Sequence, residues 1–149
     1  MFKFEKMIAW QKGVEFADKA FEIADRWPQR YQFSLGEQLG RAALSITNNL
    51  VEGSGRRTPG GQRVFYDIVK GSIYEVVGVL AIAQRRKQIS PAEYNSLYQS
   101  GDELASITSG LIDATFRAEA ATGQSSRKLR EEETEYDADD DLNTDDSNS

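Results

Sequence analysis

The sequence predicts an all-α protein that folds as an antiparallel, up-down-up-down bundle of four helices. Apolar residues recur every three or four positions in four separate segments, which is the period of one helix face. Prolines and helix-capping residues separate these segments, and no segment shows strand-like alternation or an internal repeat. Because the connections are short, consecutive helices are expected to pack side by side in opposite directions.

The first helix is predicted between Phe4 and Trp27. Pro28 ends it, because proline cannot continue the helical hydrogen-bond ladder and pushes the preceding residue out of helical geometry. The apolar face expected to line the core comprises Met7, Trp10, Val14, Ala17, Phe21 and Ala24.

The second helix is predicted to begin at Ser34. The Ser34 hydroxyl can accept a hydrogen bond from the amide of Glu37 while the Glu37 carboxylate reaches back, which is a capping box. Gly53 and Gly55 are expected to end this helix through their backbone freedom. Its buried face is expected to comprise Leu35, Leu39, Ala42, Ala43, Ile46 and Leu50.

The third helix is predicted to start at Thr58 and Pro59, with threonine as the N-cap and proline at the first helical position. It carries more apolar residues than one face of a bundle helix needs, which predicts burial between subunits and an oligomer. One stripe comprises Phe65, Ile68, Val69, Ser72, Val76, Val79 and Ala83, and the second comprises Ile73, Val77 and Leu80.

The fourth helix is predicted to begin with a capping box formed by Ser90 and Glu93 around Pro91, and to fade near Gly123. Its apolar face comprises Tyr94, Leu97, Leu104, Ile107, Leu111, Ile112 and Phe116. We therefore expect a bundle domain over residues 1–122.

The remainder, residues 123–149, is expected to be an acidic, disordered tail. Residues 128–149 hold 10 acidic and two basic residues, whereas residues 1–127 hold 16 basic and 14 acidic residues. A segment with so few apolar residues and so much charge buries too little surface to offset its ordering entropy. The body of the protein is thus mildly basic despite a net charge of −6.

The composition argues against an enzyme. The 149 residues include no cysteine and no histidine, which excludes disulfides, thiolate chemistry and the usual zinc and di-metal sites. The glycine-rich "GSGRRTPGGQ" lacks the Gly-Lys-Ser/Thr ending of a phosphate loop. We expect no catalytic residues, no cofactor and no metal. The longest apolar run covers Val76 to Ala83, and the N-terminal segment does not read as a signal peptide, so we expect a cytoplasmic protein without a membrane partner.

Several motifs resemble a known family. In order they are "FEKMIAWQKG", "LGRAALSITNNLVEGSGR", a Phe-led helix with "KGSIYE", and "ISPAEY". This order is similar to that of the bacterial four-helix-bundle proteins encoded by 23S rRNA intervening sequences, over about residues 2 to 120. The chain departs from the family pattern at Gly40, where a second arginine is common, and at Gly61 and Gln62. The most specific residues of the pattern are Arg41, Ala42, Ala43, Ser45, Ile46, Asn49, Glu52, Gly53 and Arg56.

The resemblance extends to the accessory variability determinant proteins of diversity-generating retroelements, which form pentameric barrels that bind nucleic acid and a reverse transcriptase. It implies a homopentameric barrel with a nucleic-acid role. The expected partners are further copies of the chain, the backbone of RNA or DNA, and a reverse transcriptase.

Basic residues are the candidate nucleic-acid-binding site, because guanidinium and ammonium groups bind phosphates. The alternative is that they keep a loop in solution or cap a helix, and capping is the favoured explanation for the last three. The candidates are Arg41, Arg56, Arg57, Arg63, Lys70, Arg85, Arg86 and Lys87.

The sequence thus predicts a non-enzymatic, oligomeric, nucleic-acid-binding accessory protein for a reverse transcriptase or for an rRNA intervening sequence. The alternative is a protein-interaction scaffold that binds no nucleic acid. Five aromatic residues could stack on bases, but their helical spacing favours the core; they are Tyr31, Phe33, Tyr66, Tyr94 and Tyr98.

Overall fold

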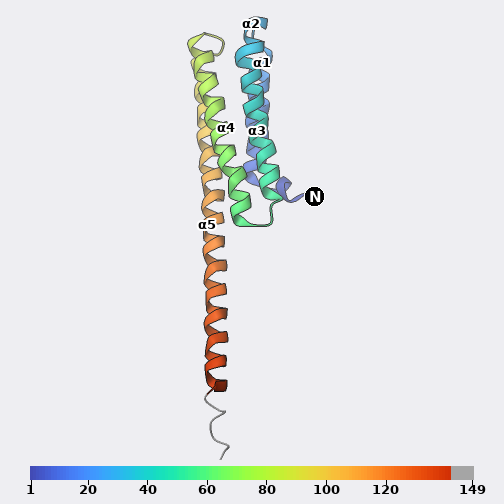
Figure 1. Cartoon of the computed structure of the whole chain (residues 1–149). Coiled ribbons are helices and arrows are strands. Elements are labelled where there is room, and N and C mark those ends of the chain that lie inside the picture. The colour runs from blue at the N-terminus through green and yellow to red at the C-terminus, as the bar shows by residue number, and fades with distance from the viewer. Residues whose placement is uncertain (142–149) are drawn as a thin grey trace, which may run out of the picture.

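A computed structural model of the chain describes residues 1–141, with side chains for residues 1–131 (Figure 1). Within these residues the chain is helical and contains no strand. A short 3₁₀ helix, η1 (Lys3–Lys6), precedes the long helices. The elements that follow are α1 (Ile8–Asp25), α2 (Gln29–Tyr31), the π-helix η2 (Gln32–Gly36), α3 (Glu37–Ser54), α4 (Pro59–Arg85) and α5 (Pro91–Asp141).

The four long helices form the predicted antiparallel bundle. Helix α3 packs against α1 and α4, and α4 packs against α5, so each helix lies beside its sequence neighbour. Two ion pairs join α1 to α5: Lys12 to Glu103 at 2.9 Å and Arg26 to Glu93 at 2.6 Å. The largest side chains that are fully buried in the shared core are Leu39, Ile46, Leu50, Val69, Ile73, Val76, Leu80 and Leu104.

The buried face of α1 differs from the predicted one. Val14 and Phe21, predicted to lie in the core, are both 39% exposed, whereas Phe16 is buried. Small residues explain the difference, because they let the α1 backbone approach its neighbours closely and so rotate the large side chains to the edge. The residues that α1 buries are Ala9, Gly13, Phe16, Ala17, Ala20, Ile23 and Ala24.

The predicted cap at Ser34 is wrong. The chain is already helical from Gln29, directly after Pro28, so Ser34 lies inside a helix and its hydroxyl donates to carbonyl groups of the preceding turn. The Gln32 side chain instead satisfies the end of α1, because its Nε2 donates to the carbonyls of Ala24 at 2.7 Å and Trp27 at 2.9 Å. The π-helix η2 allows the turn that holds Gln32 there.

The end of α3 does not depend on glycine backbone freedom. No glycine among the described residues has a positive φ, and Gly55 has φ −85° and ψ −8°, which any residue adopts. Gly53 has a packing role. A β-carbon on it would lie 2.6 Å from Cε1 of the buried Tyr66 ring, so only glycine lets α3 and α4 meet at this level.

The start of α4 agrees with the prediction, since the Thr58 hydroxyl accepts from the amide of Gly61 at 3.1 Å with Pro59 in the first turn. The second apolar stripe, however, lies mainly inside the chain's own bundle, with Val77 half-buried beside the groove between α4 and α5. Ile73 and Leu80 are buried in the chain's own core. The large apolar side chains that α4 exposes are Val64, Ile68, Tyr74 and Ile82.

The capping box that begins α5 is confirmed: Glu93 N–H donates to Ser90 Oγ at 3.1 Å, and Ser90 N–H donates to Glu93 Oε2 at 3.2 Å. The expected end near Gly123 is wrong, because α5 continues to Asp141. One glycine costs a helix only about 1 kcal/mol, and the following residues include good helix formers and an i,i+4 pair between Arg127 and Glu131.

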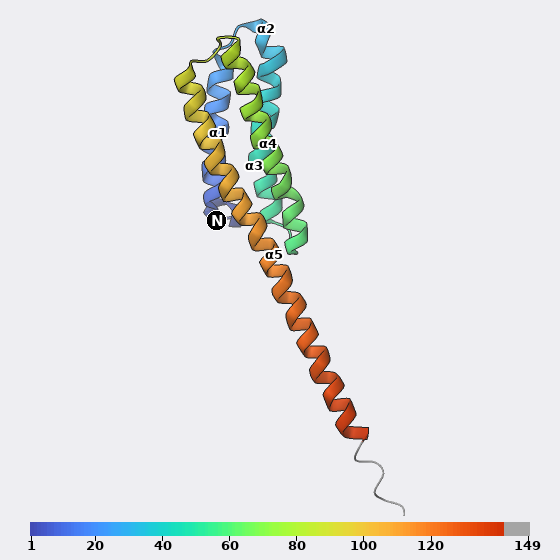
Figure 2. The same cartoon turned by 90° about the vertical axis from the view of Figure 1, so that its left-hand side faces the viewer.

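Helix α5 therefore projects well beyond the bundle, as both views show (Figures 1 and 2). Its 51 residues correspond to about 75 Å at 1.5 Å per residue. The part of the predicted disordered tail that covers residues 123–141 is helical. The rest of it, residues 142–149, lies outside the described residues. None of the described helices is long and apolar enough to cross a membrane.

Candidate nucleic-acid interface

The predicted basic residues do not form one surface. Arg56 and Arg57 lie in the loop between α3 and α4, whereas Arg85, Arg86 and Lys87 lie at the other end of α4. Because α4 has 27 residues, its ends are about 40 Å apart. Figure 1 shows the two groups at opposite ends of the bundle, with the loop after α3 at the end from which α5 projects.

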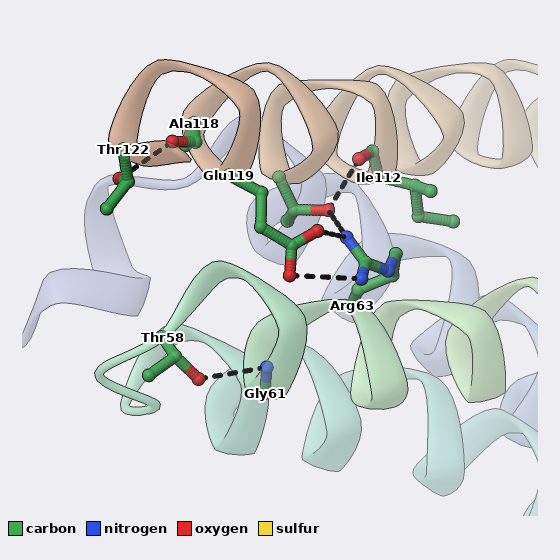
Figure 3. A network of polar contacts seen from close by, with 8 residues as sticks. Thr58, Gly61, Arg63, Ile112, Ala118, Glu119 and Thr122 are labelled. Carbon is green, nitrogen blue, oxygen red and sulfur yellow. Dashed lines mark hydrogen bonds and ion pairs between the residues drawn. The ribbon is translucent and has the colours of Figure 1, made fainter. Parts of the chain in front are cut away.

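Arg63 is held by α5 and is not presented to solvent (Figure 3). Its Nη1 donates to Glu119 Oε2 at 2.9 Å and to Thr115 Oγ1 at 3.3 Å, and its guanidinium lies 4.0 Å from the centre of the Phe116 ring. Its side chain is only 21% exposed. A guanidinium with a carboxylate, a hydroxyl and a ring as partners fastens α4 to α5, and phosphate binding would have to displace them.

Arg56 and Arg57 remain at the surface of the loop. Arg56 pairs with Glu52, one turn earlier, and its guanidinium lies 4.6 Å from the centre of the Phe65 ring. Its backbone carbonyl accepts from Gln62 Nε2 at 3.3 Å. Arg57 is exposed and has no ion pair or hydrogen bond with any residue that the structure describes. Of the three arginines in or next to this loop, Arg57 is therefore the best placed to meet a phosphate.

Arg41 and Lys70 lie apart from this loop. Arg41 is exposed on α3 and pairs with Glu37 at 3.0 Å, an i,i+4 contact. Lys70 is half-buried on α4, two turns after Arg63. The neighbouring Gly40 faces the Phe21 ring, whose Cε1 would lie 3.0 Å from an added β-carbon. Because a β-carbon would crowd the Phe21 ring, this contact explains why glycine stands at position 40, where the family described above commonly has arginine.

The cluster from Arg85 to Lys87 ends α4. Lys87 has φ 58°, and the amide of Gln88 donates to the carbonyl of Ala83 at 2.8 Å while the amide of Lys87 donates to Gln84 at 2.9 Å. These two bonds form a Schellman motif, which satisfies carbonyls at the end of the helix. The structure thus assigns Lys87 a backbone role as well as its charge, in line with the capping explanation.

The sequence reasoning missed the basic segment that precedes α1. Lys3 and Lys6 lie on η1, which packs against α3, at the same end of the bundle as the α3–α4 loop. Both lysines are exposed, and neither has an ion pair with a residue that the structure describes. The alternation of Phe and Lys in "MFKFEK" could have indicated a basic surface here, but the same residues are equally compatible with the first turn of a helix. We call Lys3, Lys6, Arg56 and Arg57 the basic end.

A groove of about 480 Å³ lies between α4 and α5. Small residues form much of its wall, including Gly78 and Gly101, and the exposed Tyr74 and Tyr98 also line it. A second hollow lies between α1 and the start of α3, and it includes Phe21 and Leu44 among its lining residues. Of the five aromatic residues considered for stacking, Tyr66 is buried, Tyr31 and Tyr94 are half-buried, and Phe33 and Tyr98 are exposed.

The chain matches the sequence model of one protein family, the 23S rRNA-intervening sequence proteins. The match covers residues 5–110, which include all of α1, α3 and α4 and the first 20 residues of α5. No curated protein matches the chain. The matched region contains the α3–α4 loop and the last two residues of η1, and it ends before the part of α5 that projects from the bundle.

Proposed function

The chain belongs to the 23S rRNA-intervening sequence protein family, and from this premise we propose that it is a non-enzymatic, self-associating accessory protein that binds the backbone of RNA or DNA. The basic end carries the proposal. Three cations there, Lys3, Lys6 and Arg57, have no ion-pair partner among the described residues. Exposed cations without a partner offer a localised site for phosphates on a protein of net charge −6, and Arg85, Arg86 and Lys87 at the opposite end of α4 are the competing site.

Binding of this kind depends on charge and not on base identity. Each phosphate that a lysine or arginine neutralises releases condensed counterions, so affinity falls steeply as salt increases. Arg56 contributes less than Arg57, because Glu52 and the Phe65 ring already hold its guanidinium. Arg63 contributes to the stability of the bundle through Glu119 and not to the interface.

Self-association is supported by apolar surfaces on opposite faces of the bundle. One is the α4–α5 groove with Tyr74 and Tyr98, and the other is the α1–α3 hollow with Phe21 and Leu44. Because α1 neighbours α3, and α5 neighbours α4, these two faces point in opposite directions. A contact between one face and the opposite face of the next copy is heterologous, and its repetition gives a ring when the rotation between copies closes and an open filament when it does not. The closed ring is the assembly that we propose.

A ring multiplies the weak charge of one copy. Cyclic symmetry places the basic end of every copy on the same rim, so one nucleic-acid strand can contact several copies at once. We propose five copies, as the resemblance to the pentameric accessory proteins implies. The nucleic acid is then either one that a reverse transcriptase copies or an RNA associated with an rRNA intervening sequence.

The second candidate function is a protein-interaction scaffold without nucleic-acid contact. Apolar side chains on the outside of α4 favour it, because Val64, Ile68 and Ile82 are each about half exposed. Large apolar residues on the solvent side of a helix often mark contact with another protein. The two functions differ in whether phosphates bind at the basic end.

Two measurements test the proposal. Fluorescence anisotropy with labelled RNA and DNA at low and at high salt should show binding that weakens strongly with salt, while light scattering should give a mass several times that of one chain. An absence of binding to either nucleic acid at low salt would exclude the interface and leave the scaffold. Single chains in dilute solution would exclude the ring.

A further inference from the structure

An exposed pair of aromatic rings lies at the basic end. The rings of Phe2 and Phe4 are stacked, with centroids 5.7 Å apart and planes inclined by 13°. Phe4 also contacts Trp10 edge to face at 4.9 Å, and both residues are half-buried. Phe2 is 72% exposed, so the stack runs from the bundle outward and ends in a ring that faces solvent.

Hydrogen bonds hold this segment in a turn and connect it to α1. The Glu5 amide donates to the Phe2 carbonyl at 3.2 Å, and the Met7 amide donates to the Phe4 carbonyl at 2.9 Å. The Gln11 side chain adds a bond from α1 to the Glu5 carbonyl at 2.9 Å. The Phe2 backbone is therefore held as the residue that precedes η1, and its ring is stacked on Phe4. An exposed aromatic ring gains free energy when a second flat surface covers it.

We propose that Phe2, backed by Phe4, is a stacking platform for an unpaired nucleobase, and that the nucleic acid bound at the basic end is single-stranded. Lys3 and Lys6 follow Phe2 in the sequence and lie on η1, and Arg57 lies in the loop at the same end of the bundle. Single-strand sites combine cations that follow the phosphates with aromatic rings on which bases stack. Cations around an exposed ring therefore fit a nucleic acid better than an uncharged apolar partner.

A duplex does not fit this platform, because its bases already stack on one another and hide their faces. A loop, a bulge or a single strand offers the unstacked base that Phe2 needs. Of the charged residues named at this end, the cations Lys3, Lys6, Arg56 and Arg57 outnumber the acids Glu5 and Glu52, so their summed charge is positive. This inference rests on the proposed function and adds to it the class of nucleic acid.

The test uses three probes on the full chain at low salt: a labelled single-stranded oligonucleotide, the same strand with abasic sites, and a duplex of equal length. The abasic strand keeps the phosphates and removes the stacking surfaces. Stacking on one ring is worth enough to make the intact strand bind about tenfold more tightly than the abasic strand. Phe2→Ala should abolish that preference, and Phe2→Trp should retain it.

Phe33→Ala is the matched control. Phe33 is 76% exposed, but it lies on η2 at the other end of the bundle, so its removal should leave the preference unchanged. Equal binding of intact, abasic and duplex probes by the unsubstituted chain would overturn the platform while leaving the proposed backbone binding intact. An unchanged preference in Phe2→Ala would also overturn it. No binding of any probe would overturn both proposals.

Discussion

Gly53 on α3 lies against the Tyr66 ring on α4 so closely that a β-carbon would come within 2.6 Å of Tyr66 Cε1 and 3.2 Å of Phe65 Cβ. The Tyr66 ring is buried and the Phe65 β-carbon is fixed by the α4 backbone, so neither can move aside without cost. We therefore expect Gly53→Ala to destabilise the protein by about 1–3 kcal/mol in urea unfolding, as overpacked cores do.

Gly71→Ala is the control for that substitution. Gly71 is exposed on α4, and an added β-carbon would meet nothing within 4 Å. Alanine should stabilise a helix there by about 1 kcal/mol, because it has a higher helix propensity than glycine. A Gly53→Ala variant as stable as the unsubstituted chain would show that α3 and α4 are less tightly packed than described.

The Arg63–Glu119 pair should contribute to stability and not to binding. Arg63→Gln removes a bidentate contact to Glu119 and the stacking on Phe116 at a site that is mostly shielded from water. We expect a loss of about 1–2 kcal/mol in urea unfolding. Arg127→Gln, which removes an exposed i,i+4 pair with Glu131, should cost less than about 0.5 kcal/mol. Equal losses for the two variants would contradict a special role of the Arg63–Glu119 contact in holding α4 to α5.

The Glu93 carboxylate predicts a pH dependence of stability. The hydrogen bond from Arg26, followed by the bond from the Ser90 amide, lowers the pKa of Glu93 below its ordinary value. A group whose pKa is lower in the folded state stabilises the protein above its unfolded pKa, about 4.3, and loses that effect as the pH falls through the folded value.

Glu93→Gln should therefore be less stable than the unsubstituted chain at pH 7, and the difference should shrink as the pH falls below about 4. Chemical unfolding at pH 7, 5 and 3 measures it. A difference that does not change with pH would mean that the Glu93 charge has no part in holding α1 to the start of α5.

Lys87 is the described non-glycine residue with positive φ, and its value of 58° favours glycine. Lys87→Gly should stabilise the protein by about 0.5–1 kcal/mol, because it removes the steric cost of the left-handed conformation. Lys87→Ala keeps that cost while it removes the charge, so it should give no such gain in thermal unfolding. A gain from alanine equal to that from glycine would show that charge, and not backbone strain, matters at this position.

Local signals in the sequence account for most of the fold. Thr58 and Ser90 cap α4 and α5 through residues only three positions away, so their sequence neighbourhood is sufficient to predict them. Ser34 carries the same signal and fails, because the chain has already entered a helix after Pro28. The rotation of α1 depends on how closely small residues such as Gly13 approach α3, which hydrophobic periodicity does not record.

The site was less predictable, because it depends on partners that are distant in the sequence. Arg63 pairs with Glu119 on another helix, and only the antiparallel packing of α4 and α5 brings them together. The local sequence does not distinguish Arg63, whose guanidinium is paired with Glu119, from Arg57, whose side chain is exposed and can meet a phosphate. The stacking of Phe2 on Phe4 required the 3₁₀ turn, where a regular helix had been expected from Phe4.

The most direct test of the account is the affinity of single-stranded RNA for a variant with Arg56→Ala and Arg57→Ala, compared with a variant that carries Arg85→Ala and Arg86→Ala. Both variants lose two positive charges, but only the first loses them from the basic end. We expect the first variant to bind at least about tenfold more weakly and with a smaller salt dependence, while it keeps the oligomer mass of the unsubstituted chain. Equal affinities for the two variants, or a greater loss for the second, would contradict the assignment of nucleic-acid binding to this end of the bundle.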